Sequence, residues 1–237
     1  MRSGLLWEVE RLLNECKELP QYLLMENVPQ VICTKNINDF KNWCQFLTEL
    51  GYTNSYKLLN AKDYGIPQNR ERCFMISILN GKKFKFPERE QLKLKLKDIL
   101  EYDVDEKYYL PSRYITNKLE VLNNNNIIAN LNYTTFNSAN RVYSIDGVSP
   151  TLRAVETQYD YLKSTKIGYI QNNKLVVRLL TPKEHLRLMG VRDNEINKFS
   201  VNSNQQIKQA GNSIVVNVLI AIFKNLFINK KYENTLF

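Results

Sequence analysis

A short apolar run that ends in an acid constrains the fold of this chain most. Residues 21–25 (QYLLM) have the composition of a buried strand, and Glu26 and Asn27 follow them directly. Apolar residues at helical or alternating spacing predict further elements around this strand. These elements lie at residues 3–17 (helix), 37–50 (helix), 52–60 (strand) and 72–79 (strand). Helices that alternate with strands are typical of an α/β layer with a mainly parallel sheet.

The position of Glu26 makes it a candidate functional residue. An acid at the carboxyl end of a parallel strand lies where open α/β sheets build their sites. The apolar residues that precede Glu26 favour the protonated form of its carboxyl group, which would make Glu26 a proton donor. A capping or salt-bridged glutamate at a strand end would have the same sequence, so both interpretations stay open at this point.

A second polar segment precedes the strand at 72–79. Gln68, Arg70 and Arg72 alternate along an extended stretch, so their side chains are expected on one face. Two arginines beside a buried strand need carboxylates, phosphates or carbonyl oxygens as partners. An exposed strand start with solvated charges is the alternative interpretation.

The net charge of +9 is unevenly distributed. Residues 1–80 hold nine Lys/Arg and nine Asp/Glu, whereas residues 81–200 hold twenty and fourteen. A basic middle section suggests contacts with phosphates. Lysine and asparagine are abundant throughout, including the run at 123–126, and an AT-rich genome would produce the same bias.

Cysteine usage argues against a zinc site and against a disulfide framework. The four cysteines form no C-x-x-C pair, and His185 is the only histidine. Free thiols in or near a core are therefore expected. No window reaches the ~18 apolar residues of a membrane helix, and glutamates come too early for a signal peptide, so a cytoplasmic protein is expected.

The chain changes character after residue 81. Residues 101–178 mix Asn, Tyr and Ser with short β-prone pieces, which predicts an irregular, β-containing domain or long insertion. A helix is expected at 182–189, with Thr181 and Glu184 as a capping box. A strongly apolar helix is expected at 211–227, capped by Asn212 or Ser213.

Four motifs occur in a fixed order along the chain. They are MENV at 25–28, IPQNRER at 66–72, RLLTPKEHLRLMG at 178–190 and QAGNSIVVNVL at 209–219. Together they resemble the DNA cytosine-5 methyltransferases, and the opening RSGLLWEVERL is similar to the family segment before ENV. The resemblance covers essentially the whole chain. It departs mildly at Val191, where the family usually has an aromatic residue.

The resemblance implies a reaction and catalytic residues. A nucleophile adds to C6 of a cytosine flipped out of double-stranded DNA, and C5 then accepts the methyl group of S-adenosyl-L-methionine, with no metal. The family's glutamate, which serves N3 and the exocyclic amine, falls on Glu26. The arginine that serves O2 falls on Arg72, and Arg70 would support the pocket.

Binding residues follow from the same likeness. Gly211, Asn212 and Ser213 correspond to a segment that lines the cofactor pocket, although a plain helix cap would explain them equally well. Four residues are expected to contact the DNA substrate, two of them the recurrent Thr-Leu pair of the target-recognition domain. These four are Asn27, Gln68, Thr151 and Leu152.

The resemblance also implies a fold and its domains. The expected fold is a partial Rossmann-like sheet of a SAM-dependent methyltransferase with a small DNA-recognition domain inserted. The catalytic layer would be 1–80, the recognition domain 81–205 including the helix at 182–189, and the returning C-terminal helix 206–237.

Two family segments are missing: the N-terminal cofactor loop and the Pro-Cys-Gln segment whose cysteine attacks C6. None of Cys16, Cys33, Cys44 and Cys73 has that context, so the chain looks cut. The main hypothesis is one subunit of a split enzyme, completed by a second chain, in restriction-modification or phage/host DNA protection. An inactive remnant and a non-catalytic, sequence-specific DNA-binding module are the alternatives.

Overall fold

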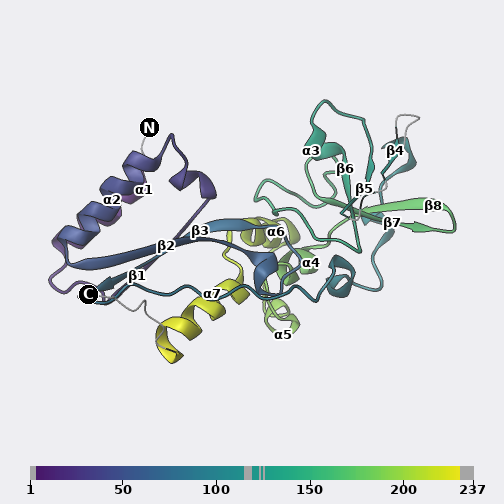
Figure 1. The fold of residues 1–237 in the computed structure, drawn as a ribbon. Coiled ribbons are helices and arrows are strands. Elements are labelled where there is room, and N and C mark those ends of the chain that lie inside the picture. Colours follow the sequence, from purple (N-terminus) through teal and green to yellow (C-terminus); the bar gives the residue numbers. More distant parts are fainter. Residues whose placement is uncertain (1–3, 115–118, 123, 125, 230–237) are drawn as a thin grey trace. The chain divides into compact units, whose positions relative to one another are not determined.

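The computed structural model describes residues 4–114, 119–122, 124 and 126–229, which form two compact units. Unit 1 consists of the residues up to 58, of 72–86 and of those from 225, and unit 2 of 59–71 and 87–224 (Figure 1). The boundaries expected at 80 and 205 describe functional domains and stay a prediction. Parts of the predicted segments lie outside the described residues. These parts are residues 1–3, 115–118, 123, 125 and 230–237.

Unit 1 is an α/β layer, as the sequence predicts. Its sheet has the order β1-β3-β2, and its two long helices flank β1 in the sequence. The bounds are α1 Gly4–Glu15, β1 Tyr22–Asn27, η1 Pro29–Ile32, α2 Ile37–Glu49, β2 Tyr52–Asn60 and β3 Glu71–Leu79. Each of the five predicted helices and strands lies within two residues of its expected bounds.

The direction of the strands differs from the prediction of a mainly parallel sheet. β1 and β3 are antiparallel, with Tyr22 opposite Ile78 and Asn27 opposite Cys73. The connection between β2 and β3, residues 61–70, is too short for the crossover of a dozen or more residues that parallel neighbours require. The described three-stranded sheet is therefore antiparallel rather than a parallel βαβ repeat.

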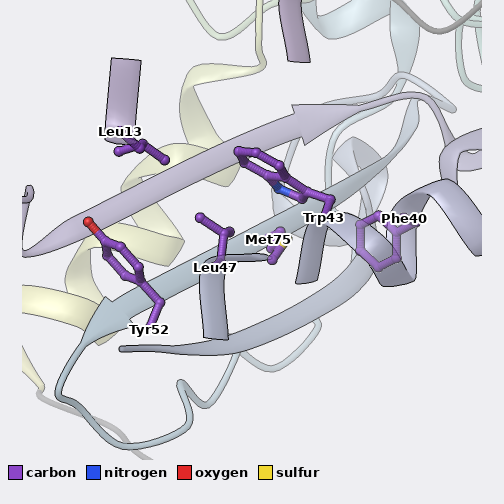
Figure 2. Close-up of a cluster of buried hydrophobic side chains, with 6 residues drawn as sticks. All are labelled: Leu13, Phe40, Trp43, Leu47, Tyr52 and Met75. Carbon is purple, nitrogen blue, oxygen red and sulfur yellow. The ribbon is translucent and has the colours of Figure 1, made fainter. Parts of the chain in front are cut away.

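The core of unit 1 forms where the two helices meet the sheet. Phe40, Trp43 and Leu47 follow helical spacing along α2 and are buried. They pack with Leu13 of α1 and Met75 of β3, as Figure 2 shows. Each such side chain contributes about 1.5–3 kcal/mol when it is fully buried, so this cluster holds β1 and β3 against the helices.

Unit 2 contains a second sheet, of order β4-β5-β6-β7-β8. Within the described residues, the neighbouring strands β6 and β7 are parallel, and the other neighbouring pairs of this sheet are antiparallel. Asn172 and Asn173, both at positive φ, make the two-residue turn between β7 and β8. The strands are β4 Glu120–Val121, β5 Ile127–Asn130, β6 Arg141–Ser144, β7 Lys166–Gln171 and β8 Lys174–Leu179. This sheet is the β-containing region that the sequence predicts.

Short helices complete unit 2. The capping box of α4 is confirmed, since Thr181 accepts from Glu184 N and the Glu184 carboxylate accepts from Thr181 N. The buried Glu184 also forms an ion pair with Arg178 at 2.7 Å. The α-helices are α3 Asn137–Asn140, α4 Pro182–Arg187, α5 Asp193–Ile196, α6 Ser203–Asn212 and α7 Val216–Phe223. Single turns are η2 Ala61–Tyr64, η3 Leu96–Ile99, η4 Glu106–Tyr108, η5 Ser112–Tyr114 and, at the start of the last part of unit 1, η6 Lys224–Ile228.

The prediction of one helix at 211–227 is wrong about the residue at which the helix begins. Gly211 and Asn212 are the last residues of α6, whose own cap is Asn202, and α7 begins only at Val216. The polar sequence of α6 conceals its helical character, so the apolar run after it dominates the pattern. The described stretch Ser203–Ile228 does have the length and composition to cross a membrane, contrary to expectation, and 28% of its apolar 18-residue window is buried within the structure.

Lys166 lies in the interior of unit 2. It is 1% exposed, and its ammonium group donates to the carbonyls of Ala139 at 2.9 Å and Ser164 at 3.2 Å. Burial lowers the pKa of Lys166 to about 8, and the charges of Glu156 and Asp160 oppose this only in part.

Lys166→Met should change how stability depends on pH. Between about pH 8 and the ordinary lysine value of 10.5, the unfolded chain holds a proton that the folded chain lacks. The contribution of Lys166 to the free energy of unfolding therefore rises with pH through this window. We expect urea titrations at pH 7.5 and pH 10 to show that the wild type gains stability relative to the variant. The exposed Lys163→Met is the control, and a difference independent of pH would contradict the analysis.

Candidate active site

Glu26 and Arg72 form an ion pair at the end of β1. The Arg72 Nε lies 3.2 Å from Glu26 Oε1, and the two side chains are 16% and 20% exposed. The ladder places Glu26 opposite Phe74, so Arg72, two residues before Phe74, lies on the same face of the sheet. The structure thus brings together an acid and a guanidinium that ligands can still reach.

Asn27 follows this pair and has a local role. Its side-chain oxygen accepts from the backbone N–H of Val28 at 2.8 Å, where the chain turns into η1. Asn27 is exposed, and its side chain lies on the face of the sheet opposite that of Glu26, because neighbouring residues of a strand alternate. The structure therefore does not bring the Asn27 side chain together with the ion pair.

Gln68 and Arg70 lie in a separate cluster, in unit 2. We call this cluster the recognition joint; it consists of residues 67–70, 149–152 and 211–213. The first two segments run alongside each other, since Asn69 N donates to Ser149 O at 2.7 Å and Ser149 N to Pro67 O at 2.8 Å. Gln68 is fully buried and donates to Leu188 O at 2.8 Å.

Arg70 connects all three segments of the recognition joint. Its guanidinium donates to Leu152 O at 3.0 Å, Gly211 O at 3.0 Å and Ser213 O at 2.8 Å. The side chain is 4% exposed, so these carbonyl oxygens replace the water that the charge would otherwise bind. Carbonyl oxygens are one of the partner classes that the sequence predicted for the two arginines.

The Thr-Leu pair is held inside this joint. The Thr151 hydroxyl donates to Asn69 O at 2.8 Å, and Leu152 is 1% exposed. The backbone N–H of Leu152 donates to the Gln68 side-chain oxygen at 3.4 Å. Both residues thus fix the path of the chain, and Thr151 is the one with surface left for a ligand.

Gly211 allows the closest approach in the joint. A Cβ atom at this position would lie 2.3 Å from Ala154 N and 2.5 Å from Arg153 C, which no side chain permits. The three residues 211–213 do not open a helix, which corrects the helix N-terminus expected there. The Ser213 hydroxyl donates to Ala210 O at 3.1 Å, so Asn212, which is exposed, has the most accessible polar side chain of the three.

The cysteines do not supply a nucleophile next to Glu26. Cys73 is fully buried, and burial raises the pKa of its thiol to about 11, which keeps it protonated at neutral pH. Burial also raises the pKa of Cys44. Cys16 and Cys33 are exposed and lie outside β1. Within the described ranges, no three His, Cys, Asp or Glu residues are grouped so that they could hold a metal.

Sequence reasoning missed two residues of the recognition joint, Asn69 and Ser149. Asn69 lies between the predicted Gln68 and Arg70, but its contribution comes from its backbone and from an amide contact with Asn60 at 2.7 Å. Backbone pairing between segments some eighty residues apart leaves no periodic signal in one sequence. The available sign was proximity in the sequence, since Asn69 lies between Gln68 and Arg70 and Ser149 lies two residues before Thr151.

Comparison with known proteins identifies the family. A family model of C-5 cytosine-specific DNA methylases matches residues 1–228. The chain belongs to this family. It is 39% identical over 229 residues to the type II methyltransferase M2.ScrFI of Lactococcus lactis subsp. cremoris, and 36% identical over 232 residues to the orphan methyltransferase M.SssI of Spiroplasma monobiae. The predicted resemblance is confirmed.

Solved structures agree on the fold. The S. pombe Dnmt2 methyltransferase superposes with a TM-score of 0.70 at 19% identity, over 98% of this chain and 75% of that one. The methyltransferase-type α/β fold is therefore confirmed. The matches cover 95% of this chain but only 59% of M2.ScrFI and 58% of M.SssI. The chain spans a little over half the length of these relatives.

Gly211→Ala should destabilise unit 2. The added methyl group would overlap the backbone at Ala154, which must shift, and such overpacking costs about 1–3 kcal/mol. Thermal unfolding should show a midpoint lower by roughly 2–4 °C for each kcal/mol lost. Ser213→Ala is the matched control, because it keeps the carbonyl that Arg70 binds and loses one hydrogen bond of about 1 kcal/mol. An unchanged midpoint for Gly211→Ala would contradict the close approach.

Proposed function

We propose that this chain supplies the base-binding and DNA-recognition part of a DNA cytosine-5 methyltransferase. The enzyme would transfer a methyl group from S-adenosyl-L-methionine to C5 of a flipped cytosine in a specific DNA sequence. The observation that carries this proposal is the accessible Glu26–Arg72 pair at the end of β1, in a chain of this family. The setting would be cytoplasmic DNA protection, as in a restriction-modification system or a phage.

The pair fits the polar edge of cytosine. That edge presents an exocyclic amine, the ring nitrogen N3 and the carbonyl oxygen O2 side by side. In the proposal, the carboxyl group of Glu26 binds the amine and N3, and the guanidinium of Arg72 donates to O2. Both interactions withdraw electron density from C6 and make it more electrophilic. The two groups lie 3.2 Å apart without a ligand, so the base would separate them as it enters.

The reaction needs a thiolate from another polypeptide segment. Its sulfur forms a bond to C6, and the electron pair gained at C5 forms the bond to the methyl group as the methyl–sulfur bond breaks. Loss of the C5 proton then expels the thiolate and restores the C5–C6 double bond. Cys73 is protonated and fully buried, which is why we propose that a second chain with the N-terminal half of the enzyme provides the thiolate.

S-adenosyl-L-methionine would supply the electrophilic methyl group. Of residues 211–213, Gly211 is covered by Ala154 and the Ser213 hydroxyl is bonded within the chain. The accessible amide of Asn212 is therefore the contact we assign to the cofactor in this segment. The remaining contacts would come from the second chain.

Unit 2 would read the DNA. Its sequence has a positive net charge, with 21 Lys/Arg against 16 Asp/Glu, which suits phosphate contacts. We propose that Gln68 and Arg70 act as positioning residues, because Gln68 donates to the backbone carbonyl of Leu188 and Arg70 to that of Leu152. Thr151 would then be presented to the substrate, with Leu152 as its buried anchor.

Glu26→Gln should abolish most methyl transfer. The assay follows labelled methyl groups from S-adenosyl-L-methionine to mixed-sequence DNA, with this chain alone and with a polypeptide that carries the rest of the enzyme. We expect activity only in the mixture, and a loss of about 10²–10⁴-fold in the variant, the usual contribution of an acid or base. Glu195→Gln, at an exposed carboxylate of α5, is the control and should keep full activity.

Two results would contradict the proposal. Full activity of Glu26→Gln in the mixture would remove Glu26 from the reaction. No methyl transfer with any complementing polypeptide, while DNA binding persists, would instead favour a non-catalytic DNA-binding module.

A further inference from the structure

The chain that follows the Thr-Leu pair has no regular secondary structure. All residues between β6 and β7 are described, and they form neither a helix nor a strand. We call residues 151–165 of this stretch the Thr-Leu segment. An irregular segment has no ladder of backbone hydrogen bonds to fix its path, so side chains must supply the missing partners. The side chains that hold this segment therefore also set the position of Thr151.

A buried carboxylate holds the Thr-Leu segment together. The oxygens of Glu156, which is 1% exposed, accept from Arg153 N at 3.1 Å, from Thr165 N at 2.9 Å and from the Thr165 hydroxyl at 3.1 Å. Burial alone would raise the pKa of Glu156, but His185 and the backbone N–H groups of Thr165 and Arg153 lower it below its ordinary value. Glu156 is therefore a charged carboxylate at neutral pH.

His185 connects this carboxylate to α4. The residue is 2% exposed, and its Nε2 lies 3.4 Å from Glu156 Oε2 while its Nδ1 lies 2.8 Å from Thr181 O. A carbonyl oxygen accepts hydrogen bonds and cannot donate them, so Nδ1 carries a proton. A carboxylate oxygen also only accepts, so Nε2 needs a proton of its own to bind it. The partners on the two sides of the ring together require a doubly protonated, positively charged imidazolium.

A neutral ring would bring two electron-rich atoms together. With its single proton on Nδ1, the ring of His185 would turn the lone pair of Nε2 toward the Glu156 carboxylate. Both side chains are nearly inaccessible to solvent, so water cannot replace the lost hydrogen bond as it would at the surface. The contact between the segment and α4 therefore depends on the second proton of His185.

Other charged groups lie on the elements around this pair. Arg153 Nε is 3.8 Å from Glu156 Oε1, and Lys166 of β7, whose pKa is about 8, keeps its proton below that pH. Arg178 of β8 and Glu184 of α4 are paired with each other at 2.7 Å. Further groups are Asp160 of the segment, Lys208 of α6, and Asp193 of α5 with its partners Lys183 and Arg187 of α4. Among these residue types, histidine is the one whose charge ordinarily changes between pH 5.5 and 7.

We propose that the His185 imidazolium is a positioning residue for DNA recognition, because it holds the Thr-Leu segment against α4 through Glu156. The segment precedes β7 and α4 follows β8, so the ion pair joins the two ends of the β7–β8 hairpin. The ion pair is complete while both ring nitrogens carry protons, and it is lost as the pH rises and Nε2 loses its proton. The link to DNA rests on the proposed function, whereas the protonation of the ring does not.

Nitrogen NMR of the imidazole ring tests the protonation directly. His185 is the only histidine of the chain, so labelled histidine gives one pair of ring signals that needs no assignment. We expect both ring nitrogens to be protonated at pH 6. The wild-type ring should lose its second proton about one pH unit or more above the ring of Glu156→Gln, because the variant lacks the negative charge. One unprotonated nitrogen at pH 6, or equal titrations of the two proteins, would overturn the proposal.

Two substitutions of His185 separate the roles of its ring nitrogens. Glutamine reaches toward the place of Nε2 and keeps a donor for Glu156, whereas asparagine reaches only the place of Nδ1 and keeps a donor for Thr181 O. At pH 6 we expect the amides of Arg153 and Thr165 to exchange with solvent about tenfold faster in His185→Asn, and within about threefold of the wild type in His185→Gln. Equal exchange in the two variants would overturn the role of Nε2. If unfolding curves show that His185→Asn does not fold, the ring titration decides.

Methyl transfer tests the link to DNA. In the mixture with the polypeptide that carries the rest of the enzyme, His185→Asn should raise KM for mixed-sequence DNA by about tenfold and leave kcat nearly unchanged. His185→Gln is the matched control and should stay within about threefold of the wild type. Equal KM values of the two variants would overturn the positioning role. No methyl transfer by any mixture, with the ring titration and the exchange as expected, would refute the proposed function and leave the ion pair and its proton established.

Discussion

Unit 2 depends most on the hydrogen bonds that the Arg70 guanidinium donates. A charge that is 4% exposed needs hydrogen-bond partners in the protein, and here backbone carbonyls of residues 152, 211 and 213 accept from the two terminal nitrogens of the guanidinium. These carbonyls belong to segments that are far apart in the sequence. Their positions are thus set by one side chain, and the absence of a Cβ at Gly211 lets two of the segments touch. Removal of the charge would leave three carbonyls without a donor and two segments without a common anchor.

Only Glu71 separates Arg70 from Arg72, yet the environments of the two arginines differ completely. Arg70 faces neutral carbonyl oxygens and is nearly inaccessible, whereas Arg72 faces a carboxylate and stays partly accessible. A buried guanidinium with fixed partners suits a structural role, and an accessible one whose partner can be displaced suits a ligand. The Q-x-R-x-R pattern therefore places its two arginines in different environments, and the difference arises from burial rather than from residue type.

Sequence reasoning predicted the elements of unit 1 well, because their signals are local. Phe40, Trp43 and Leu47 repeat at helical spacing. The capping box of α4, in unit 2, was predicted for the same reason, because Thr181 and Glu184 lie within four residues of each other. The antiparallel direction of β3 was missed, because apolar runs of this length do not distinguish parallel from antiparallel strands. α6 was missed because its sequence, SNQQIKQAGN, is polar and buries only Ile207 and Ala210.

The predictions for the candidate site also divide into those that have a local signal in the sequence and those that have none. Glu26 and Arg72 were each predicted as functional residues, one from a strand end and one from a motif. The ladder between β1 and β3 brings them into contact. The partners of Arg70 and the reason for Gly211 were not predicted, since both depend on backbone atoms of residues 152–154 that carry no identifying side chain. Resemblance to a family locates such residues but does not state their physical role.

The contacts of β1 show why a strand with one open edge can still be well ordered. Its helical face is fixed by the cluster around Trp43 and Leu47, and one edge is fixed by the ladder with β3. Every second residue of an antiparallel strand turns its backbone groups away from its neighbour, and at Leu24 and Glu26 water can satisfy these groups without loss of the fold. Because electrostatic interactions strengthen as water is excluded, a ligand that displaces water from the Glu26–Arg72 pair would also strengthen the interactions that these two groups make.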